Sequence, residues 1–417
     1  MEKKSRKWFA AICFRGLLFL ALCGIVMLSS CSSDSDNVHV VLPTKARIVK
    51  TVRYDQDQTT AFNFEYPSTD PDGNEIMLSG TITMGDEVMK DRHARGLLLY
   101  NHYTVYRADQ CPSKGYLAIQ KKITGSGLIT ISADYYGFGI TEDKMQAYCI
   151  SRCNAQASVD ALIQAKILLA NMGYEWDDVT FNAGYSEGGQ TAIGVLRLVT
   201  EKYPSIRFAY TFAGGGSYDI PETYRQMLQT GETVMPSTVI SVLLSYNEYF
   251  SLGIPRSDIF QEPVLSHIDE WFLSKEYDAD QIDANIASTT IADWVTPAML
   301  DFGSEPSMRY MAALDQDNLC KGWQPRRDER ILLVHHTEDQ AVPVANATNL
   351  HDFLVGQGVT FKYGDYNVAD YGTLGKLPAH QMGAVRFMLL SVDRVCKVLD
   401  INPWISLTPQ DLYSFLY

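Results

Sequence analysis

The chain carries little positive charge for its size. Its 417 residues include 35 Lys and Arg against 49 Asp and Glu, which gives a formal net charge of −14 at pH 7. A surface with this excess of acid repels phosphate backbones. We therefore do not expect a nucleic acid among its partners.

The chain also lacks a hydrophobic run long enough to cross a bilayer. Its most apolar segment, residues 16–28, is shorter than the roughly 20 residues that a spanning helix needs. Residues 1–30 hold five basic residues and one acid, a net charge of +4, and end in small side chains. This combination is typical of a secretory signal peptide.

A cysteine stands where this signal ends. The run Leu-Ser-Ser-Cys at 28–31 resembles a bacterial lipobox, in which Cys31 becomes the lipid-bearing N-terminus of the mature chain. Residues 31–45 then form a polar, acidic tether that has too little apolar surface to pack. We expect an outer-membrane lipoprotein. Similar tethers occur in lipoproteins exported to the cell surface, so the face of the membrane stays open.

Cysteines are too few and too unevenly placed for a disulfide framework. Three of the eight, Cys13, Cys23 and Cys31, belong to the signal segment and the lipobox. The remaining five are Cys111, Cys149, Cys153, Cys320 and Cys396. Five is an odd number, so at least one thiol stays outside any intrachain disulfide, and the pairing is left open.

Two further patterns of ligand binding are missing. Cys149 and Cys153 have no matching Cys or His pair at zinc-site spacing. The three glycines at 214–216 lack the Lys-Ser/Thr that completes a phosphate-binding P-loop. We expect no metal and no cofactor.

The folded part, residues 46–417, reads as an α/β domain. Three β-type segments open it at 46–54, 60–66 and 75–84, with an Asp-Pro-Asp-Gly-Asn turn before the third. From residue 96 onward strands alternate with helices, including strands at 96–100 and 128–133 and a helix at 155–172. This alternation predicts an antiparallel start followed by a mostly parallel sheet flanked by helices.

Ser186 is the candidate nucleophile. Residues 179–185 form an apolar β-type run that leads into Gly-Tyr-Ser-Glu-Gly, and residues 191–200 have apolar side chains at helical spacing. A serine on a sharp turn between a strand and a helix, with glycines on both sides, is the pattern of a nucleophile elbow. The alternative is a structural serine in a glycine-rich turn.

A serine nucleophile also needs a base and an acid that orients this base, and candidates for both lie later in the chain. A buried strand at 331–334 leads into a loop that contains Asp339, and a further strand is predicted at 359–363. His380 follows that strand at the start of an apolar helix, whereas His351 lies inside the helix 346–354. His335 and His336 lie too close to the loop of the acid to act as its base, and we expect them to shape that loop. Asp219, after the strand predicted at 206–213, is the alternative acid.

The order Ser186, Asp339, His380 resembles the α/β-hydrolase superfamily. With the Asp-Tyr-Tyr-Gly-Phe-Gly loop at 134–139, the chain is most similar to the secretory lipase and esterase branch, over residues 46–417. The resemblance implies a helical lid between the sixth and seventh strands. Between the strand at 206–213 and Arg330 the sequence holds a helical insertion of matching length, about residues 220–327, which is too long for a loop.

The same resemblance assigns the groups that stabilise an oxyanion. The backbone N–H of Glu187 is the first donor, and the second comes from the loop after the third strand, at Tyr103 or Thr104. His102 is expected to pack within that loop. Three aromatic side chains of the lid, Tyr246, Tyr249 and Phe250, are candidates to line the substrate cleft.

Together these features predict a serine hydrolase that cleaves carboxylic esters through an acyl-enzyme. The substrate would be a small-molecule, glycan or lipid ester met at the cell envelope. A peptidase of the same superfamily is the alternative, although peptidases of this superfamily usually add a propeller, and the chain has no segment of that size. A non-catalytic binding lipoprotein on a hydrolase scaffold is the further alternative, but such a protein would normally have lost one member of the triad.

Overall fold

The computed structural model describes residues 45–115, 126–372 and 377–402. The predicted signal peptide, Cys31 and all of the predicted tether except Lys45 lie outside the described residues. No disulfide joins Cys111, Cys149, Cys153 or Cys320. Within the described part of the chain, no helix has both the length and the apolar character needed to span a membrane.

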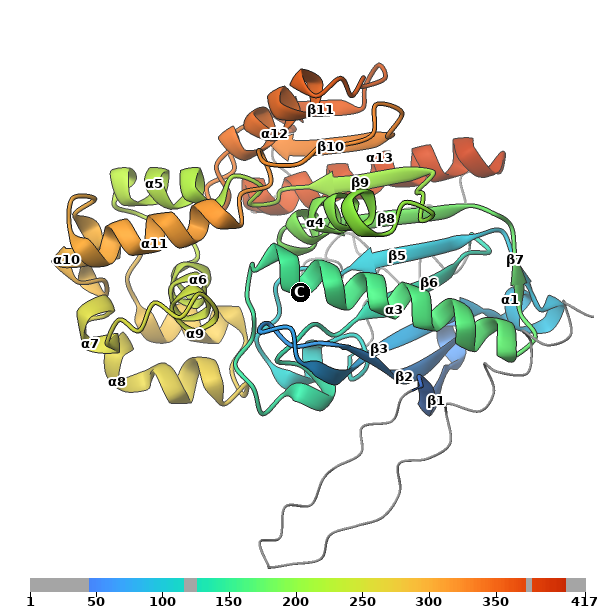
Figure 1. The fold of residues 1–417 in the computed structure, drawn as a ribbon, viewed down its shortest axis with the longest axis horizontal. Coiled ribbons are helices and arrows are strands. Elements are labelled where there is room, and N and C mark those ends of the chain that lie inside the picture. Colours follow the sequence, from blue (N-terminus) through green and yellow to red (C-terminus); the bar gives the residue numbers. More distant parts are fainter. Residues whose placement is uncertain (1–44, 116–125, 373–376, 403–417) are drawn as a thin grey trace, which may run out of the picture. The chain divides into compact units, whose positions relative to one another are not determined.

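A nine-stranded sheet forms the centre of the domain, with the strand order β1-β2-β3-β6-β5-β8-β9-β10-β11 (Figure 1). The strands are β1 (Arg47–Tyr54), β2 (Thr59–Thr69), β3 (Glu75–Gly85), β5 (Leu97–Asn101), β6 (Ile129–Ala133), β8 (Thr180–Tyr185), β9 (Tyr210–Gly214), β10 (Ile331–His336) and β11 (Tyr366–Ala369). Strands β1 to β3 pair in antiparallel fashion, as does β3 with β6, and the remaining pairs are parallel. The predicted antiparallel start and parallel continuation are confirmed.

Helices cover both faces of this sheet, because alternate side chains of each strand point to opposite faces. Leu97 and Leu99 of β5 join a core with α3 (Ser151–Asn171), α4 (Glu187–Lys202) and α12 (Ala345–Gly356). Leu98 and Tyr100 of the same strand join a second core with α13 (Ala379–Leu399). A short helix α1 (Asp86–Asp91) and a small two-stranded sheet of β4 (His93–Ala94) and β7 (Glu175–Trp176) complete this body.

One predicted strand is wrong. Residues 359–363 are not a strand, and the last strand is instead β11, seven residues further on, which pairs in parallel with β10. Val359 and Phe361 pack on the same core as α12, so their apolar character serves that packing and not a sheet register. A turn at Lys362–Asp365, closed by the Asp365 N–H on the Lys362 carbonyl, then starts β11.

An inserted helical segment connects β9 to β10, at the position expected from the sequence (Figure 1). Its helices are α5 (Ile220–Thr230), α6 (Pro236–Tyr249), α7 (Arg256–Ile259), α8 (Val264–Ile268), α9 (Ala279–Ile286), α10 (Pro297–Leu300) and α11 (Glu305–Gln316), with a π-helical turn at Asp269–Leu273. The segment has its own hydrophobic core, which includes Ile240, Trp294 and Tyr310. It therefore packs as a subdomain and not as a loop.

Two buried polar contacts fasten this inserted segment to the body of the domain. The ammonium group of Lys275 donates hydrogen bonds to the carbonyl oxygens of Gly137, Glu142 and Lys144. Asp317 accepts hydrogen bonds from the backbone N–H of Ser151 at 2.6 Å and from its hydroxyl at 2.7 Å, at the start of α3. Both side chains are almost fully buried, so each contact would be costly to break.

We predict that Lys275→Met lowers the free energy of unfolding by about 2–3 kcal/mol, because three buried carbonyl groups lose their donor. Lys144→Met is the matched control, since the Lys144 ammonium forms an exposed ion pair with Asp143 and such pairs contribute under about 1 kcal/mol. Chemical denaturation of both variants measures the difference. Equal stability of the two variants would show that the Lys275 contact does not fasten the insertion.

Candidate active site

Ser186 lies at a tight turn between β8 and α4. Its backbone has φ 58° and ψ −124°, a strained conformation for a residue with a side chain. The flanking glycines permit the turn: a β-carbon on Gly188 would lie 2.2 Å from the carbonyl oxygen of Asn101, and one on Gly184 would lie 2.0 Å from that of Gly188. No other residue type fits at either position, and the turn presents the Ser186 hydroxyl at the carboxyl edge of the sheet.

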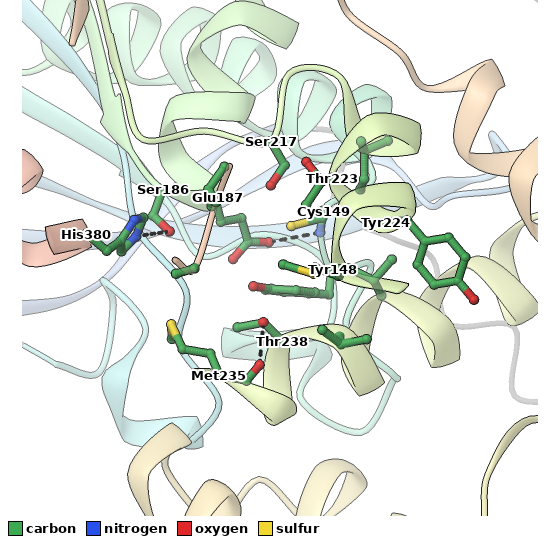
Figure 2. Close-up of a pocket in the computed structure, with 16 residues that line it drawn as sticks. Tyr148, Cys149, Ser186, Glu187, Ser217, Thr223, Tyr224, Met235, Thr238 and His380 are labelled. Atoms are coloured by element: carbon green, nitrogen blue, oxygen red, sulfur yellow. Dashed lines mark hydrogen bonds between the residues drawn. The ribbon is translucent and has the colours of Figure 1, made fainter. Parts of the chain in front are cut away.

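The structure brings Ser186, His380 and Asp339 into one hydrogen-bonded chain. His380 Nε2 lies 3.0 Å from Ser186 Oγ, and His380 Nδ1 lies 2.6 Å from Asp339 Oδ2. The contact between His380 and Ser186 is visible in Figure 2. The three residues come from the ends of β8 and β10 and from the first turn of α13, so the parallel sheet and its last helix bring them together.

The Asp339 carboxylate is held in place on both oxygens. Its Oδ1 accepts the backbone N–H groups of Ala341 and Val342, each at 2.9 Å, while Oδ2 faces His380. Burial acts to raise the pKa of Asp339, but the adjacent His380 and these hydrogen bonds outweigh it and hold the pKa below its ordinary value. Asp339 is therefore a carboxylate at neutral pH, able to stabilise a positive charge on His380.

The sequence predicted a strand that ends at residue 334, before the two neighbouring histidines. In the structure both histidines belong to the end of β10 and not to the loop that holds the acid. His335 is buried, and its Nε2 donates a hydrogen bond to the Val342 carbonyl at 2.8 Å. Burial lowers the pKa of His335, so the ring stays neutral. His336 lies edge-on to Tyr371. His335 thus supports the loop that holds Asp339 from within the strand.

The alternative acid, Asp219, serves another purpose. It caps the N-terminus of α5 by accepting the Glu222 N–H, and it also accepts the side-chain amides of Asn318 at 3.0 Å and Asn349 at 2.8 Å. These contacts join the inserted segment to α12. His351, on that helix, stacks on Tyr366 at 4.0 Å between ring centroids, as expected for a packing residue.

Tyr185 is a supporting residue that the sequence analysis did not single out. Its hydroxyl donates a 2.6 Å hydrogen bond to the His380 carbonyl, and the two rings lie 5.1 Å apart. This bond ties the start of α13 to the residue that precedes Ser186. The aromatic residue directly before the serine was the available signal in the sequence.

The loop after β5 packs against the start of α4, where the candidate oxyanion donors lie. A β-carbon on Gly188 would meet the carbonyl oxygens of both Asn101 and His102, so this loop and the helix N-terminus are in contact. The first N–H groups of a helix have no partner within the helix, which leaves the Glu187 N–H available. His102 is buried within the loop, stacked on Tyr135 and within 2.7 Å of the Tyr103 carbonyl, so it packs as expected.

A narrow cavity of about 50 Å³, open to solvent at its mouth, adjoins Ser186 and His380 (Figure 2). Its walls come mainly from α5, α6 and the residues before α3, and most of the exposed wall is apolar. The other lining residues are Tyr148, Cys149, Glu187, Ser217, Ile220, Thr223, Tyr224, Met227, Met235, Thr238, Val239, Val242, Ala341 and Val342.

The three aromatic residues proposed to line the cleft do not line this cavity. Tyr246 is fully buried and donates to the Cys149 carbonyl, while the Tyr249 hydroxyl bonds to the Met145 carbonyl. Phe250 stacks on Tyr246 with ring centroids 4.9 Å apart. All three join the insertion to the body: Tyr246 and Tyr249 bond to the segment before α3, and the Arg152 guanidinium of α3 lies 4.2 Å from the Phe250 ring centroid. Within the described residues no group of three or more His, Cys, Asp or Glu side chains could hold a metal ion.

Comparison with solved structures places this architecture among known folds. A Legionella pneumophila protein assigned provisionally as a hydrolase superposes with a TM-score of 0.70 at 21% identity, over 84% of this chain and 91% of that chain. The rice cell wall degrading esterase LipA from Xanthomonas oryzae gives 0.67 at 19% identity, over 85% and 96%. The chain has the α/β-hydrolase fold. Candida antarctica lipase A in its closed state gives 0.64 at 14% identity, over 85% and 81%.

No protein-family model and no curated protein matches the chain. The likeness to these solved structures therefore establishes the α/β-hydrolase fold, and the geometry at Ser186 has to carry any statement about chemistry.

We predict that Asp339→Asn lowers kcat about 10⁴-fold on any substrate of this site, because a mis-set imidazole tautomer costs about that much in known triads. Asp219→Asn should change kcat less than tenfold, since Asn caps a helix as well as Asp. Steady-state kinetics on the two purified variants measure both effects. A larger loss of kcat in Asp219→Asn than in Asp339→Asn would show that Asp219, after β9, is the acid that orients the histidine.

Proposed function

We propose that the protein is a serine hydrolase that cleaves carboxylic esters through an acyl-enzyme. The observation that supports this most strongly is the hydrogen-bonded chain from Ser186 through His380 to Asp339. A serine hydroxyl is a weak nucleophile on its own and needs an adjacent base that a third group orients. All three groups are in place, which favours an enzyme over a non-catalytic binding protein.

The proposed reaction begins when Ser186 Oγ attacks the ester carbonyl carbon. His380 Nε2 takes the hydroxyl proton as this bond forms, and Asp339 stabilises the imidazolium across the 2.6 Å contact with Nδ1. The tetrahedral intermediate collapses when His380 returns the proton to the leaving alcohol. Water, activated by the same imidazole, then releases the acid and restores Ser186.

The oxyanion of the intermediate would accept hydrogen bonds from the backbone N–H of Glu187 and from that of Tyr103. Contact between the β5 loop and the start of α4 supports this assignment, because the two segments that would carry the donors touch at Gly188, two residues after Ser186. Each donor aimed at the developing charge contributes about 3 kcal/mol to catalysis in comparable sites. The positive end of the α4 dipole adds to the same effect.

An ester is favoured over a peptide for two reasons. The cavity beside Ser186 is mainly apolar, with a few polar tips, which suits a short or medium acyl group or a small alcohol. Two of the structurally similar proteins are named as an esterase and a lipase. The inserted segment, which walls this cavity with α5 and α6, would act as a lid over the substrate.

We further propose that the protein acts as a lipoprotein of the outer membrane, anchored through Cys31. The support is the basic and apolar segment that ends in Leu-Ser-Ser-Cys and the polar tether that follows it. A lipid anchor would keep the domain at the cell envelope, where glycan and lipid esters are found.

We predict that the purified protein hydrolyses p-nitrophenyl esters of short to medium acyl chains and that Ser186→Ala lowers kcat by at least about 10³-fold, because the triad acts as a unit. The Ser205→Ala variant is the control, since that serine lies outside the site. Circular dichroism verifies that both variants fold. Cleavage of aminoacyl amides without cleavage of esters would contradict the proposed esterase activity and favour a peptidase.

We predict that Cys31→Ser moves the protein from the membrane fraction to the soluble fraction, because a serine cannot carry the thioether-linked lipid. Cys111→Ser is the control, since this buried thiol lies within the folded domain. Fractionation of bacterial cells followed by immunoblotting measures the distribution. Retention of Cys31→Ser in the membrane would argue against the lipid anchor.

A further inference from the structure

The side chain of Glu187 reaches into the cavity beside Ser186. In Figure 2 its carboxyl group points away from Ser186 and His380, into the middle of the lining residues. One oxygen, Oε1, accepts the backbone N–H of Cys149 at 3.3 Å and the side-chain amide of Asn154 at 3.1 Å. These two bonds fix the direction of the carboxyl group.

The second oxygen of Glu187 has no partner. Among the described residues no group hydrogen-bonds to Oε2, although the side chain is only 3% exposed. A buried polar atom without a partner is costly, and native structures keep few of them. The neighbouring hydroxyls are satisfied elsewhere: that of Tyr148 pairs with the Thr104 hydroxyl at 3.0 Å, and that of Thr238 donates to the Met235 carbonyl at 2.7 Å.

Two other side-chain hydroxyls of the cavity wall, those of Ser217 and Tyr224, also make no hydrogen bond in the described structure. The hydroxyl of Tyr224 is buried and unpaired, but in Figure 2 it points away from Ser186 and from Glu187. Glu187 Oε2 and the Ser217 hydroxyl therefore remain as unpaired groups of the wall, and Oε2 is the buried one of the two.

We propose that Glu187 Oε2 forms a specificity subsite that binds a hydroxyl group on the part of the ester held in this cavity. The preferred substrate is thus an ester of a hydroxylated acid or of a polyhydric alcohol, such as a sugar or glycerol. This inference rests on the proposed ester hydrolysis and adds the chemical class of the substrate.

A hydroxyl fits this position better than an ammonium group. Burial raises the pKa of Glu187 to about 7, so both protonation states are present near neutral pH. A hydroxyl can accept the proton of the acid form and can donate to the carboxylate, whereas an ammonium group only donates and leaves the proton of the acid form without an acceptor. Placing a charged amine against a mostly apolar wall would also cost more than placing a neutral hydroxyl.

Matched esters of equal chain length test the subsite on both sides of the scissile bond. The acyl pair is p-nitrophenyl butyrate and p-nitrophenyl 3-hydroxybutyrate, with the 3-amino ester as a third member. The alcohol pair is butyl acetate and 4-hydroxybutyl acetate. The quantity measured is the ratio of kcat/KM within each set, on one enzyme preparation, so that it does not depend on how much protein folds.

Wild-type protein should prefer the hydroxylated member of at least one pair by about tenfold, the value of one hydrogen bond to a buried acceptor. Glu187→Met, which removes both oxygens, should bring that ratio to within about twofold of one. Glu187→Gln should keep part of the preference, because its amide still bonds to a hydroxyl. Thr238→Val is the control in the same wall and should leave the ratio unchanged.

Hydrolysis of all esters by wild-type protein without preference for a hydroxyl would overturn the subsite and leave the esterase intact. A preference for the 3-amino ester would overturn it in favour of an aminoacyl substrate. A preference for the hydroxylated ester that persists in Glu187→Met would show that another residue binds the substrate hydroxyl and would overturn the subsite. Failure of folded wild-type protein to cleave any ester would overturn the proposed function together with the subsite.

Discussion

Close backbone packing at the turn from β8 into α4 is the constraint on which the site depends. The α4 backbone at Gly188 lies against the loop after β5, where a β-carbon would be only 2.2 Å from the Asn101 carbonyl oxygen. At the same turn Ser186 has φ 58°, and its hydroxyl lies 3.0 Å from His380 Nε2. The residues proposed as oxyanion donors belong to the two segments that meet at this contact. The strands on either side of β8, β5 and β9, are fully buried, and such packing can hold a residue in a strained conformation.

The inserted segment is coupled to this turn through the start of α3. Asn154 and the Cys149 N–H hold the Glu187 side chain, while Ser151, three residues before Asn154, binds Asp317 at the end of the insertion. Lys275 makes a second buried attachment to the loop at 137–144. The cavity wall and the nucleophile therefore share their supports, so a change in the insertion would alter the shape of the substrate site.

Features with local signals were predictable from the sequence, and features set by packing were not. The turn at Ser186 needs glycines at fixed positions, and the order of strands and helices places His380 after the last strand, so both could be read from residues near one another. Residues 359–363 alternate like a strand, yet Phe361 packs on a helix and the short, half-buried β11 carries little pattern of its own. The prediction that Tyr246, Tyr249 and Phe250 line the cleft was wrong. Aromatic character alone does not tell which face of a helix meets the body. The unpaired oxygen of Glu187 is likewise visible only in three dimensions.

The central claim is that His380 and Asp339 activate the hydroxyl of Ser186 as a nucleophile. Reaction with a fluorophosphonate followed by peptide mapping tests it most directly, since the reagent bonds covalently to an activated serine. We predict a single adduct on the peptide that contains Ser186, with labelling slowed by at least about 10³-fold in His380→Ala. An adduct on another serine, or undiminished labelling of Ser186 in His380→Ala, would contradict the account.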